Sequence, residues 1–423
     1  MMEVIKIEGG HELNGTISVG GSKNATVALI PAAVLACGGE IKIYGVPEID
    51  DVENLINLLK ELNVKVDYDG KDSISIVTDD MVNIPLESKA VTKLRASYYF
   101  MGALLGKYKR VQMKMPGGCY LGPRPIDLHL KGFEALGATV TYEQGSYIIE
   151  AKELIGNKIY LDFASVGATI NIMFAAVYAQ GKTVIENAAK EPEIIDVATM
   201  LNKMGANIKG AGTSMITIEG VECLVGCTHE IIPDRIVAGT YLILASAMAK
   251  EVTIENIIPH HLESLISKLQ EMGVKMDVGI DTIKVSRAEK LTSVDINTQP
   301  YPGFATDLQQ PLTTLLTQAE GTSIVRENIY TERFKHCLEL QRMGADIQLS
   351  PAQATIEGPT PLDGDYVTAT DLRCGASLIV AGLIAKGVTT IQDIYHIDRG
   401  YDNIDEKLRA IGANIWRATE KKD

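Results

Sequence analysis

The sequence is poor in several features that mark particular classes of protein. Aromatic residues make up 5% of the 423 residues, with a single tryptophan. Six cysteines in so long a chain do not make the disulfide framework of a small secreted domain. The most apolar runs, such as ATVALIPAAVLACGG, are too short to span a bilayer, and the N-terminal MMEVIKIEGG carries charges where a secretory signal would be apolar. We therefore expect a cytoplasmic protein without membrane association.

Positive charge is also in deficit. The formal net charge is −14, which argues against general nucleic-acid binding, because that function needs a basic face. An anionic substrate would have to be bound by a local cationic pocket, because the net negative charge of the whole protein repels it. Apolar residues make up 46% of the chain, which predicts a globular protein, and the length of 423 residues suggests two or three domains.

The chain contains six copies of one structural unit. Six related segments each follow a helical apolar pattern and precede an alternating strand pattern: ELNVKV, ALGATV, KMGANI, EMGVKM, RMGADI and AIGANI. Their third residue recurs every 68 to 74 positions, and it is Asn63 in the first copy and glycine in the others. These two residue types most readily adopt the left-handed conformation that ends a helix, so each segment predicts a helix stop.

A second helix in each copy is apolar almost all round. A helix without a polar face must be surrounded by protein, so we expect these helices to be buried and covered by the amphipathic helices and sheets. The six segments are residues 23–38, 94–107, 167–181, 235–250, 306–321 and 371–387. Each copy thus reads as buried helix, strand, loop, amphipathic helix and two strands.

The sixth copy lacks its final strand, because the chain ends at NIWRATEKKD. A matching strand pattern occurs at the other end of the chain, in VIKIEGGHELNGTISV. We infer that the N-terminal strand completes the last copy. The alternative is that residues 4–18 form an independent hairpin.

Charged and capping residues recur where the buried helices begin. Ser165, Asp234, Asp307 and Asp371 could simply cap the free N–H groups there. Lysine and arginine are not capping residues, and their recurrence at a positive helix end favours binding of an anion such as phosphate. The residues concerned are Lys23, beside Asn24, and Arg95, Arg235 and Arg373.

Other motifs fail. The QGKT segment lacks the first glycine of a P-loop, and Cys223, Cys227 and His229 lack a clear fourth ligand for zinc. Cys37 and Cys374 lie in segments with apolar helical patterns and are expected to be inert packing residues.

Cys119 differs from the other cysteines, because it lies between glycines in the segment PGGCYLGPRPIDLHL, near Lys114 and Arg124. Thiols in such cationic loops tend to be reactive. A nucleophilic thiol needs a base, and His129 is ten residues away. A proton-donating thiol does not need one, so both roles stay open on these residues alone.

Several segments together resemble the enolpyruvyl transferase family. They are PGGCYLGPRPIDLHL, GSKNA, LRAS, PGFATDLQQP, ERFKH, ATDLRCGASL and IYHIDRGYDNIDEKLRAIGAN, in an order that runs from about residue 5 to residue 416. The resemblance implies an α/β fold of two inside-out α/β barrel domains, each of three repeated βαβαββ units with buried helices. Sequence patterns alone leave open one ring of six copies or two rings of three. The implied domains are residues 23–232, and residues 1–22 with 233–423, with the active site in the cleft between them.

The implied reaction moves the enolpyruvyl group of phosphoenolpyruvate to the 3′-hydroxyl of UDP-N-acetylglucosamine and releases phosphate, the first committed step of peptidoglycan synthesis. No metal or organic cofactor is implied. By the resemblance, Cys119 is the acid, Asp307 the base, and Lys23 a further catalytic residue. The residues that match the phosphoenolpyruvate site are Lys23, Asn24, Arg124 and Arg399.

The implied nucleotide-sugar site is larger. Its residues come from the starts of several buried helices and from the RPIDL stretch: Asn24, Arg95, Arg124, Pro125, Ile126, Asp127, Leu128, Phe163, Ala164, Ser165, Val166, Asp307 and Ile329. Arg333, Asp371 and Arg373 are implied supports of the pocket.

This sequence departs from some family members in three places. Phe163 and Asp50 stand where those members carry lysine, and Tyr99 stands where some carry tryptophan. Two alternative functions remain: an enolpyruvyl transferase with another acceptor, and a non-catalytic protein that binds a nucleotide sugar. The oligomeric state is left open.

Overall fold

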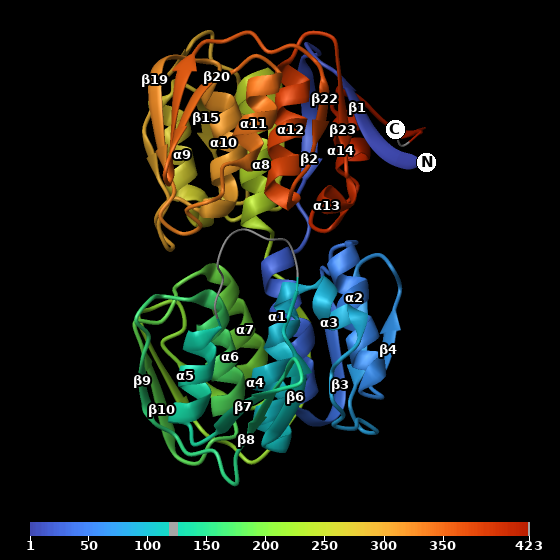
Figure 1. Ribbon diagram of the computed structural model, residues 1–423, viewed down its shortest axis with the longest axis vertical. Helices are drawn as coiled ribbons and strands as arrows, with labels where there is room; N and C mark the ends of the chain where they lie inside the picture. The colour runs from blue at the N-terminus through green and yellow to red at the C-terminus, as the bar shows by residue number, and fades with distance from the viewer. Residues whose placement is uncertain (118–125, 422–423) are drawn as a thin grey trace. The chain divides into compact units, whose positions relative to one another are not determined.

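The computed structural model describes residues 1–117 and 126–421 of the chain. The described residues form two compact units, which we call the N-terminal unit (residues 21–232) and the C-terminal unit (residues 1–20 and 233–421). Both ends of the chain belong to the C-terminal unit (Figure 1). In the part of the chain that is described, no helix combines the length and apolarity needed to cross a membrane.

The described part of the N-terminal unit holds three buried helices inside three small sheets. The buried helices are α1 (Lys23–Ala32), extended by η1 (Ala33–Leu35), α4 (Tyr99–Tyr108), preceded by η2 (Arg95–Tyr98), and α6 (Val166–Ala176). The more amphipathic helices are α2 (Asp50–Glu61), α5 (Asp127–Ala135) and α7 (Pro192–Lys203), and a short α3 spans Lys89–Lys93.

The sheets of this unit have the strand orders β13-β3-β5-β4, β6-β8-β7 and β11-β12-β10-β9. Their strands are β3 (Ala36–Tyr44), β4 (Lys65–Tyr68), β5 (Ser73–Val77), β6 (Arg110–Lys114), β7 (Thr139–Glu143), β8 (Ser146–Glu150), β9 (Lys158–Tyr160), β10 (Lys182–Glu186), β11 (Asn207–Lys209), β12 (Met215–Glu219) and β13 (Leu224–Glu230). The inward apolar residues of these strands cover the buried helices, as the alternating patterns require.

The C-terminal unit repeats this plan. Its buried helices α8 (Arg235–Met248), α10 (Thr306–Leu316) and α12 (Leu372–Ile384) each pack against the other two. The outer helices are α9 (Glu263–Glu271), which follows η3 (Pro259–Leu262), α11 (Lys335–Arg342), α13 (Tyr395–Asp398) and α14 (Ile404–Ala410). Figure 1 shows strands on the outside of these helices.

The sheets of the C-terminal unit have the orders β22-β23-β1-β24, β15-β16-β14-β2 and β17-β19-β21-β20, with β18 beside β19. Their strands are β1 (Met2–Glu8), β2 (Leu13–Ser18), β14 (Ala249–Glu255), β15 (Lys275–Val278), β16 (Thr282–Ser286), β17 (Leu291–Thr292), β18 (Ile296–Asn297), β19 (Ala319–Arg326), β20 (Asp346–Ser350), β21 (Gln353–Gly358), β22 (Tyr366–Thr368), β23 (Val388–Gln392) and β24 (Asn414–Glu420). The repeated βαβαββ units and buried helices confirm the predicted fold class.

The N-terminal strand completes the last copy of the repeat, as predicted. β1 lies between β23 and β24 and pairs with both in antiparallel register, so that Ile5 is opposite Ile391 on one side and Arg417 on the other. β2 instead pairs in parallel with β14, in another sheet. Residues 4–18 are therefore not an independent hairpin.

The predicted helix stops are also confirmed. Gly137, Gly205, Gly273, Gly344 and Gly412 have φ angles between +95° and +111°, and Asn63 has φ of +57°. The side chain of Asn63 donates to the carbonyl of Asp80 at 2.9 Å, which helps an asparagine to occupy the left-handed position.

One expectation about the cysteines is wrong. Cys37 was expected in an apolar helix, but the helix ends at Leu35, and Cys37 is the second residue of β3, where it is exposed. Cys374 does lie in a buried helix, α12.

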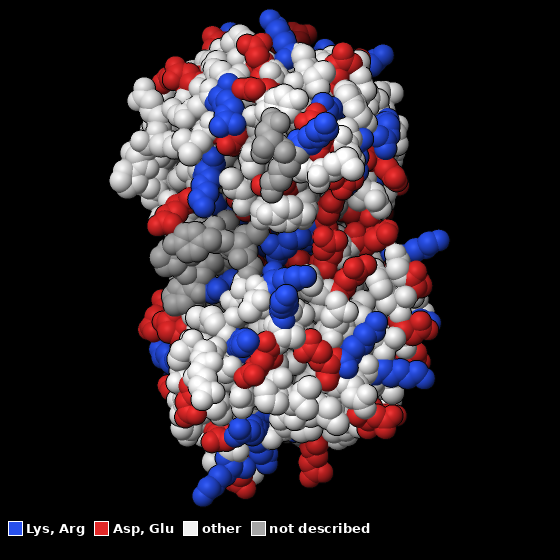
Figure 2. Space-filling model, turned by 45° about the vertical axis from the view of Figure 1, so that its right-hand side comes forward, with Lys and Arg blue, Asp and Glu red and all other residues white. Residues whose placement is uncertain are grey.

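Surface charge of both signs is interspersed over the face drawn in Figure 2. That face is not the continuous basic surface by which proteins bind nucleic acid electrostatically.

Candidate functional site

Three of the buried helices are capped by the side chains that the sequence suggested. Asp371 accepts from the N–H groups of Arg373 and Cys374 at 2.9 and 3.1 Å, and Asp234 caps α8 in the same way. Ser165 caps α6 through the N–H of Ala168. For these three residues the capping interpretation is sufficient.

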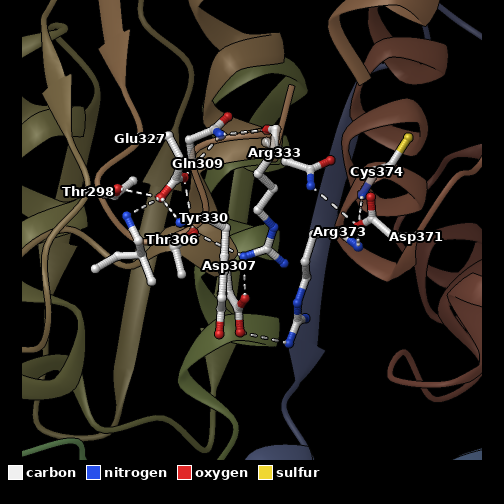
Figure 3. A network of polar contacts seen from close by, with 12 residues as sticks. Thr298, Thr306, Asp307, Gln309, Glu327, Tyr330, Arg333, Asp371, Arg373 and Cys374 are labelled. Carbon is white, nitrogen blue, oxygen red and sulfur yellow. Dashed lines mark hydrogen bonds and ion pairs between the residues drawn. The ribbon is translucent and has the colours of Figure 1, made fainter. Parts of the chain in front are cut away.

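Asp307 does not cap its helix. It lies in the first turn of α10, where its carboxylate is held by two arginines from other elements (Figure 3). Arg333 Nη1 is 2.8 Å from Oδ1, and Arg373 Nη2 is 3.4 Å from Oδ2. Both arginine side chains are 4% exposed and the Asp307 side chain is 24% exposed, so the carboxylate is the accessible end of a buried charge cluster.

The arginines determine the charge of Asp307. Burial acts to raise the pKa of its carboxyl group, but the positive charges of Arg373 and Arg333 outweigh burial and hold the pKa well below its ordinary value. Asp307 is therefore an ionised hydrogen-bond acceptor at any physiological pH. As a base it is weak, and it can take a proton only from a strongly acidic group.

Arg373 is itself fixed by side chains of other elements. Its Nη1 donates to the hydroxyl of Tyr401 at 3.2 Å, and that hydroxyl is 2.8 Å from Thr240 Oγ1 on α8. The chain of contacts joins α8 to the starts of α10 and α12, so the guanidinium has little freedom to move.

Glu327 organises the segment that leads to Arg333. It lies just after β19, is fully buried, and accepts hydrogen bonds from Thr298 Oγ1 at 2.6 Å and Thr306 Oγ1 at 3.0 Å. It also accepts from the backbone N–H groups of Ile329 and Tyr330 at 3.0 and 3.1 Å. The carboxyl group therefore joins the end of β19 to the first residue of α10 (Figure 3).

Gln309 extends this network toward the charge cluster. Its amide nitrogen donates to Glu327 Oε2 at 3.2 Å and to the backbone carbonyl of Arg333 at 3.0 Å. The backbone of Arg333 and its side chain are thus both held from α10, since the guanidinium also donates to Thr306 Oγ1 at 3.1 Å.

In the N-terminal unit, Lys23 is the first residue of α1 and its ammonium group is 2.7 Å from Asp51 Oδ2. Asp51 lies in the first turn of α2 and its side chain is 1% exposed, whereas that of Lys23 is 12% exposed. Ser22 caps α1 through the N–H of Ala25 at 3.1 Å. A buried carboxylate therefore holds a cation at a positive helix end, which is a suitable arrangement for an anionic ligand.

A second polar group of this unit surrounds His129 on α5. The side-chain oxygen Oδ1 of Asn171 on α6 accepts a hydrogen bond from the N–H of Gly102 on α4 at 2.8 Å. The amide nitrogen Nδ2 of Asn171 is 2.9 Å from the Tyr98 carbonyl and 2.9 Å from His129 Nδ1. Because the amide nitrogen can only donate, Nδ1 is an acceptor and the ring is neutral with its proton on Nε2.

Burial, and then the charge of Arg95, lower the pKa of His129 to about 3. An effective general base has a pKa near the working pH, so His129 is poorly suited to deprotonate a thiol. Its ring instead packs against Tyr98, the last residue of η2, with ring centroids 4.7 Å apart, and so supports the short helix that begins at Arg95.

Comparison with known proteins identifies the family. The sequence profile of the family described as EPSP synthase (3-phosphoshikimate 1-carboxyvinyltransferase) matches residues 7–408. The chain belongs to this family.

Curated relatives within the family match over almost the whole chain. A protein of Listeria monocytogenes serotype 4b named UDP-N-acetylglucosamine 1-carboxyvinyltransferase 2 is 59% identical over 419 residues, which are 99% of each chain. A Geobacillus kaustophilus protein of the same name is 58% identical over 416 residues, covering 98% of this chain and 97% of the relative. This family member is accordingly an enzyme, a transferase.

Solved structures support the fold. The enolpyruvyl transferase NikO from Streptomyces tendae superposes with a TM-score of 0.90 at 25% identity, over 99% of this chain and all of the other. EPSP synthase from Acinetobacter baumannii gives a TM-score of 0.74 at 19% identity over the same shares of the two chains.

The remaining predicted site residues of this family member lie as follows. Ile126 is buried before α5, Asp127 is exposed at its start, and Leu128 is half-buried. Phe163 is 45% exposed, and Ala164, Ser165 and Val166 are half-buried at the start of α6. Asn24, Ile329 and Arg399 are also half-buried, and Cys119, Arg124 and Pro125 lie outside the described residues.

The structure thus groups the predicted residues in two sets. Asp307, Arg333, Asp371 and Arg373 form one network in the C-terminal unit. Lys23 in the N-terminal unit has its own carboxylate partner. Sequence reasoning missed Asp51, Asn171 and Glu327. A polar residue inside an apolar helix was a usable signal for Asn171, whereas Asp51 and Glu327 look like ordinary charged residues near element ends.

Proposed function

We propose that this chain transfers the enolpyruvyl group of phosphoenolpyruvate to the 3′-hydroxyl of UDP-N-acetylglucosamine and releases phosphate, as the first committed step of peptidoglycan synthesis. The observation that carries the proposal is the identity of 59%, over 99% of both chains, with a relative that is named for this reaction. The ionised Asp307 between two arginines supplies the oxygen acceptor that the reaction needs.

The proposed chemistry is an addition followed by an elimination. The Cys119 thiol gives its proton to the methylene carbon of phosphoenolpyruvate, and the sugar 3′-oxygen bonds to the neighbouring carbon. The Cys119 thiolate then takes a proton back from the new methyl group as phosphate departs, which restores the double bond and the thiol. The phosphate leaves with the proton that the 3′-hydroxyl lost, so the products are the enolpyruvyl ether and inorganic phosphate, and atoms and charge balance without a metal or organic cofactor.

The geometry of Asp307 fits one particular step. A carboxylate with a strongly lowered pKa does not remove a proton from an alcohol in advance. It accepts a hydrogen bond from the 3′-hydroxyl, orients its oxygen, and takes the proton once bond formation makes that oxygen strongly acidic. Arg333 and Arg373 hold the carboxylate in place for this transfer.

We assign the anionic groups of the substrates to the cationic residues. Lys23, Arg124 and Arg399, with Asn24 beside Lys23, bind phosphoenolpyruvate. Arg95, the stretch 126–128, residues 163–166 and Ile329 bind the nucleotide sugar. Exposed Phe163, which stands where some relatives have lysine, offers an apolar surface and no charge for the diphosphate.

Incubation of the chain with phosphoenolpyruvate and UDP-N-acetylglucosamine, followed by measurement of phosphate, tests the proposal. Phosphate release that depends on the sugar is expected. Release with shikimate 3-phosphate in place of this sugar would support a transferase with another acceptor. Tight binding of the nucleotide sugar without any release would support a non-catalytic binding protein.

A further inference from the structure

Two exposed cysteines of the N-terminal unit lie together, although 186 positions separate them in the sequence. Cys37 is the second residue of β3 and Cys223 directly precedes β13. These two strands pair in parallel, with Leu224 opposite Ala36 and Val225 opposite Gly38, so Cys37 is the extra residue at a local irregularity. The Cys223 thiol lies 3.5 Å from the carbonyl of Leu224, the residue that pairs with Ala36, so the two thiols are close enough for each to shift the pKa of the other.

Polar groups surround Cys37 on its other sides. The Tyr178 hydroxyl is 3.4 Å from its sulfur, accepts from the N–H of Leu224 at 3.1 Å, and donates to the carbonyl of Leu35. The ammonium group of Lys107 donates to the carbonyl of Ala36 at 2.7 Å, next to Cys37 in the chain. The sulfur therefore has a cation and hydrogen-bonding groups close to it.

These surroundings make the two thiols unequal. Burial acts to raise the pKa of Cys37, but the neighbouring Cys223 thiol, the Tyr178 hydroxyl and the Leu224 backbone, together with the charge of Lys107, give a net lowering. The proximity of Cys37 raises the pKa of Cys223. A more acidic, accessible thiol beside a second thiol is the arrangement found at oxidation-sensitive sites.

We propose that Cys37 and Cys223 form an oxidation site, in which Cys37 reacts with a hydroperoxide and Cys223 converts the product to an intramolecular disulfide. The Cys37 thiolate attacks one peroxide oxygen, the O–O bond breaks, and the leaving oxygen takes a proton. With hydrogen peroxide this gives water and a sulfenic acid. Cys223 then attacks the Cys37 sulfur, the S–O bond breaks, and a second water leaves. The peroxide is reduced by two electrons, and the two thiols are oxidised.

Two of the other described cysteines provide internal controls. Cys337 and Cys374 are fully buried, and burial is the main cause that raises both pKa values, that of Cys374 to about 12. Neither is expected to react at doses of peroxide that oxidise Cys37.

To test the proposal, the full chain is treated with hydrogen peroxide, and the remaining thiols are blocked with N-ethylmaleimide in denaturant. The peptides are then mapped by mass spectrometry. We expect a Cys37–Cys223 cross-linked peptide that disappears after reduction with dithiothreitol, while Cys337 and Cys374 are alkylated as in the untreated chain. Full alkylation of Cys37 and Cys223 at doses that oxidise Cys119 would overturn the proposal. Pairing of either cysteine with another residue or another chain would also overturn it.

Single variants separate the two roles. In Cys223→Ser the Cys37 sulfenic acid should accumulate and be trapped by dimedone. In Cys37→Ser, dimedone should label Cys223 about tenfold more slowly than it labels Cys37 in Cys223→Ser. Lys107→Met should slow the labelling of Cys37 in the Cys223→Ser background. Equal labelling of the two cysteines would contradict the assignment of Cys37 as the attacking thiol. Because both cysteines are exposed, the variants should fold, which circular dichroism checks.

Discussion

Arg333 and Asp307 form an ion pair in which Nη1 is 2.8 Å from Oδ1, and the guanidinium is almost completely buried while the carboxylate remains accessible. A buried cation thus holds an accessible anion at the start of α10. In the proposed reaction, this pair fixes the charge and the position of the group that receives the hydroxyl proton.

Replacement of Arg333 should change the pH dependence of turnover. With Asp307 held ionised by its arginines, kcat/KM should show no acidic limb from this carboxyl group in the normal assay range. In Arg333→Gln its pKa should rise, so activity should fall as the pH decreases toward about 5, and the maximal rate should drop by about tenfold or more. The matched control is Arg342→Gln, at an exposed arginine of α11. An unchanged profile in Arg333→Gln would refute the role assigned to this ion pair.

Substitutions of Cys119 should separate an acid from a nucleophile. Aspartate can donate a proton, so Cys119→Asp should keep turnover while resisting thiol-alkylating epoxides such as fosfomycin. A serine hydroxyl is far too weak an acid, so Cys119→Ser should lose turnover. Both are measured as phosphate release with and without the epoxide, and an active serine variant would remove the proposed acid role.

Glu327 should act as a positioning residue. Glu327→Gln replaces one acceptor oxygen with a donor that faces N–H or O–H donors, so we expect the free energy of unfolding to fall by about 1–3 kcal/mol. The KM for the nucleotide sugar should rise more than kcat falls, because the backbone of Ile329 loses its acceptor. Glu320→Gln, at an exposed position of β19, is the control. Denaturant unfolding and steady-state kinetics provide the two measurements, and equal effects of both substitutions would contradict this role.

Buried histidines should make the protein less stable in mild acid. Burial is the main cause that lowers the pKa values of His129 and His336 to about 3. Below about pH 6.5 the unfolded chain binds protons that the folded chain excludes, so each histidine should reduce the free energy of unfolding by up to about 1.4 kcal/mol per pH unit until its folded pKa is reached.

The histidine prediction is tested by urea unfolding at several pH values. His129→Gln retains an acceptor for Asn171 and should reduce the slope of stability against pH by about 1.4 kcal/mol per unit between pH 6 and 4. His11→Gln, at an exposed histidine, should leave the slope unchanged. Equal slopes in all three proteins would show that His129 is not buried in its neutral form.

Features set by local chemistry or by the sixfold repeat were predictable from the sequence. The helix stop at Asn63 and the pairing of β1 with β23 follow from residue types and strand patterns that repeat along the chain. Cys37 was misplaced because the apolar pattern continues beyond Leu35, whereas the chain leaves the helix through a short 3-10 turn.

The contacts within the charge cluster were less accessible to sequence reasoning. Asp307 meets Arg333 and Arg373 across 26 and 66 positions. Arg333 comes from the segment before α11, and the packing of α10 beside α12 brings Arg373 to Asp307. Glu327 gave no signal, because a charged residue after a strand usually faces solvent, and its burial depends on donors from two other segments, the residue Thr298 and helix α10. The resemblance to a family, and no pattern in this chain alone, pointed to Asp307 as the base.

The most direct test is the identity of the product formed from phosphoenolpyruvate and UDP-N-acetylglucosamine, with Asp307→Asn as the comparison. Mass spectrometry and phosphate measurement should find the enolpyruvyl ether of the sugar in an amount equal to the phosphate released, and the variant should be slower by at least about a hundredfold. Phosphate without the ether, or a variant as fast as the natural chain, would contradict the account.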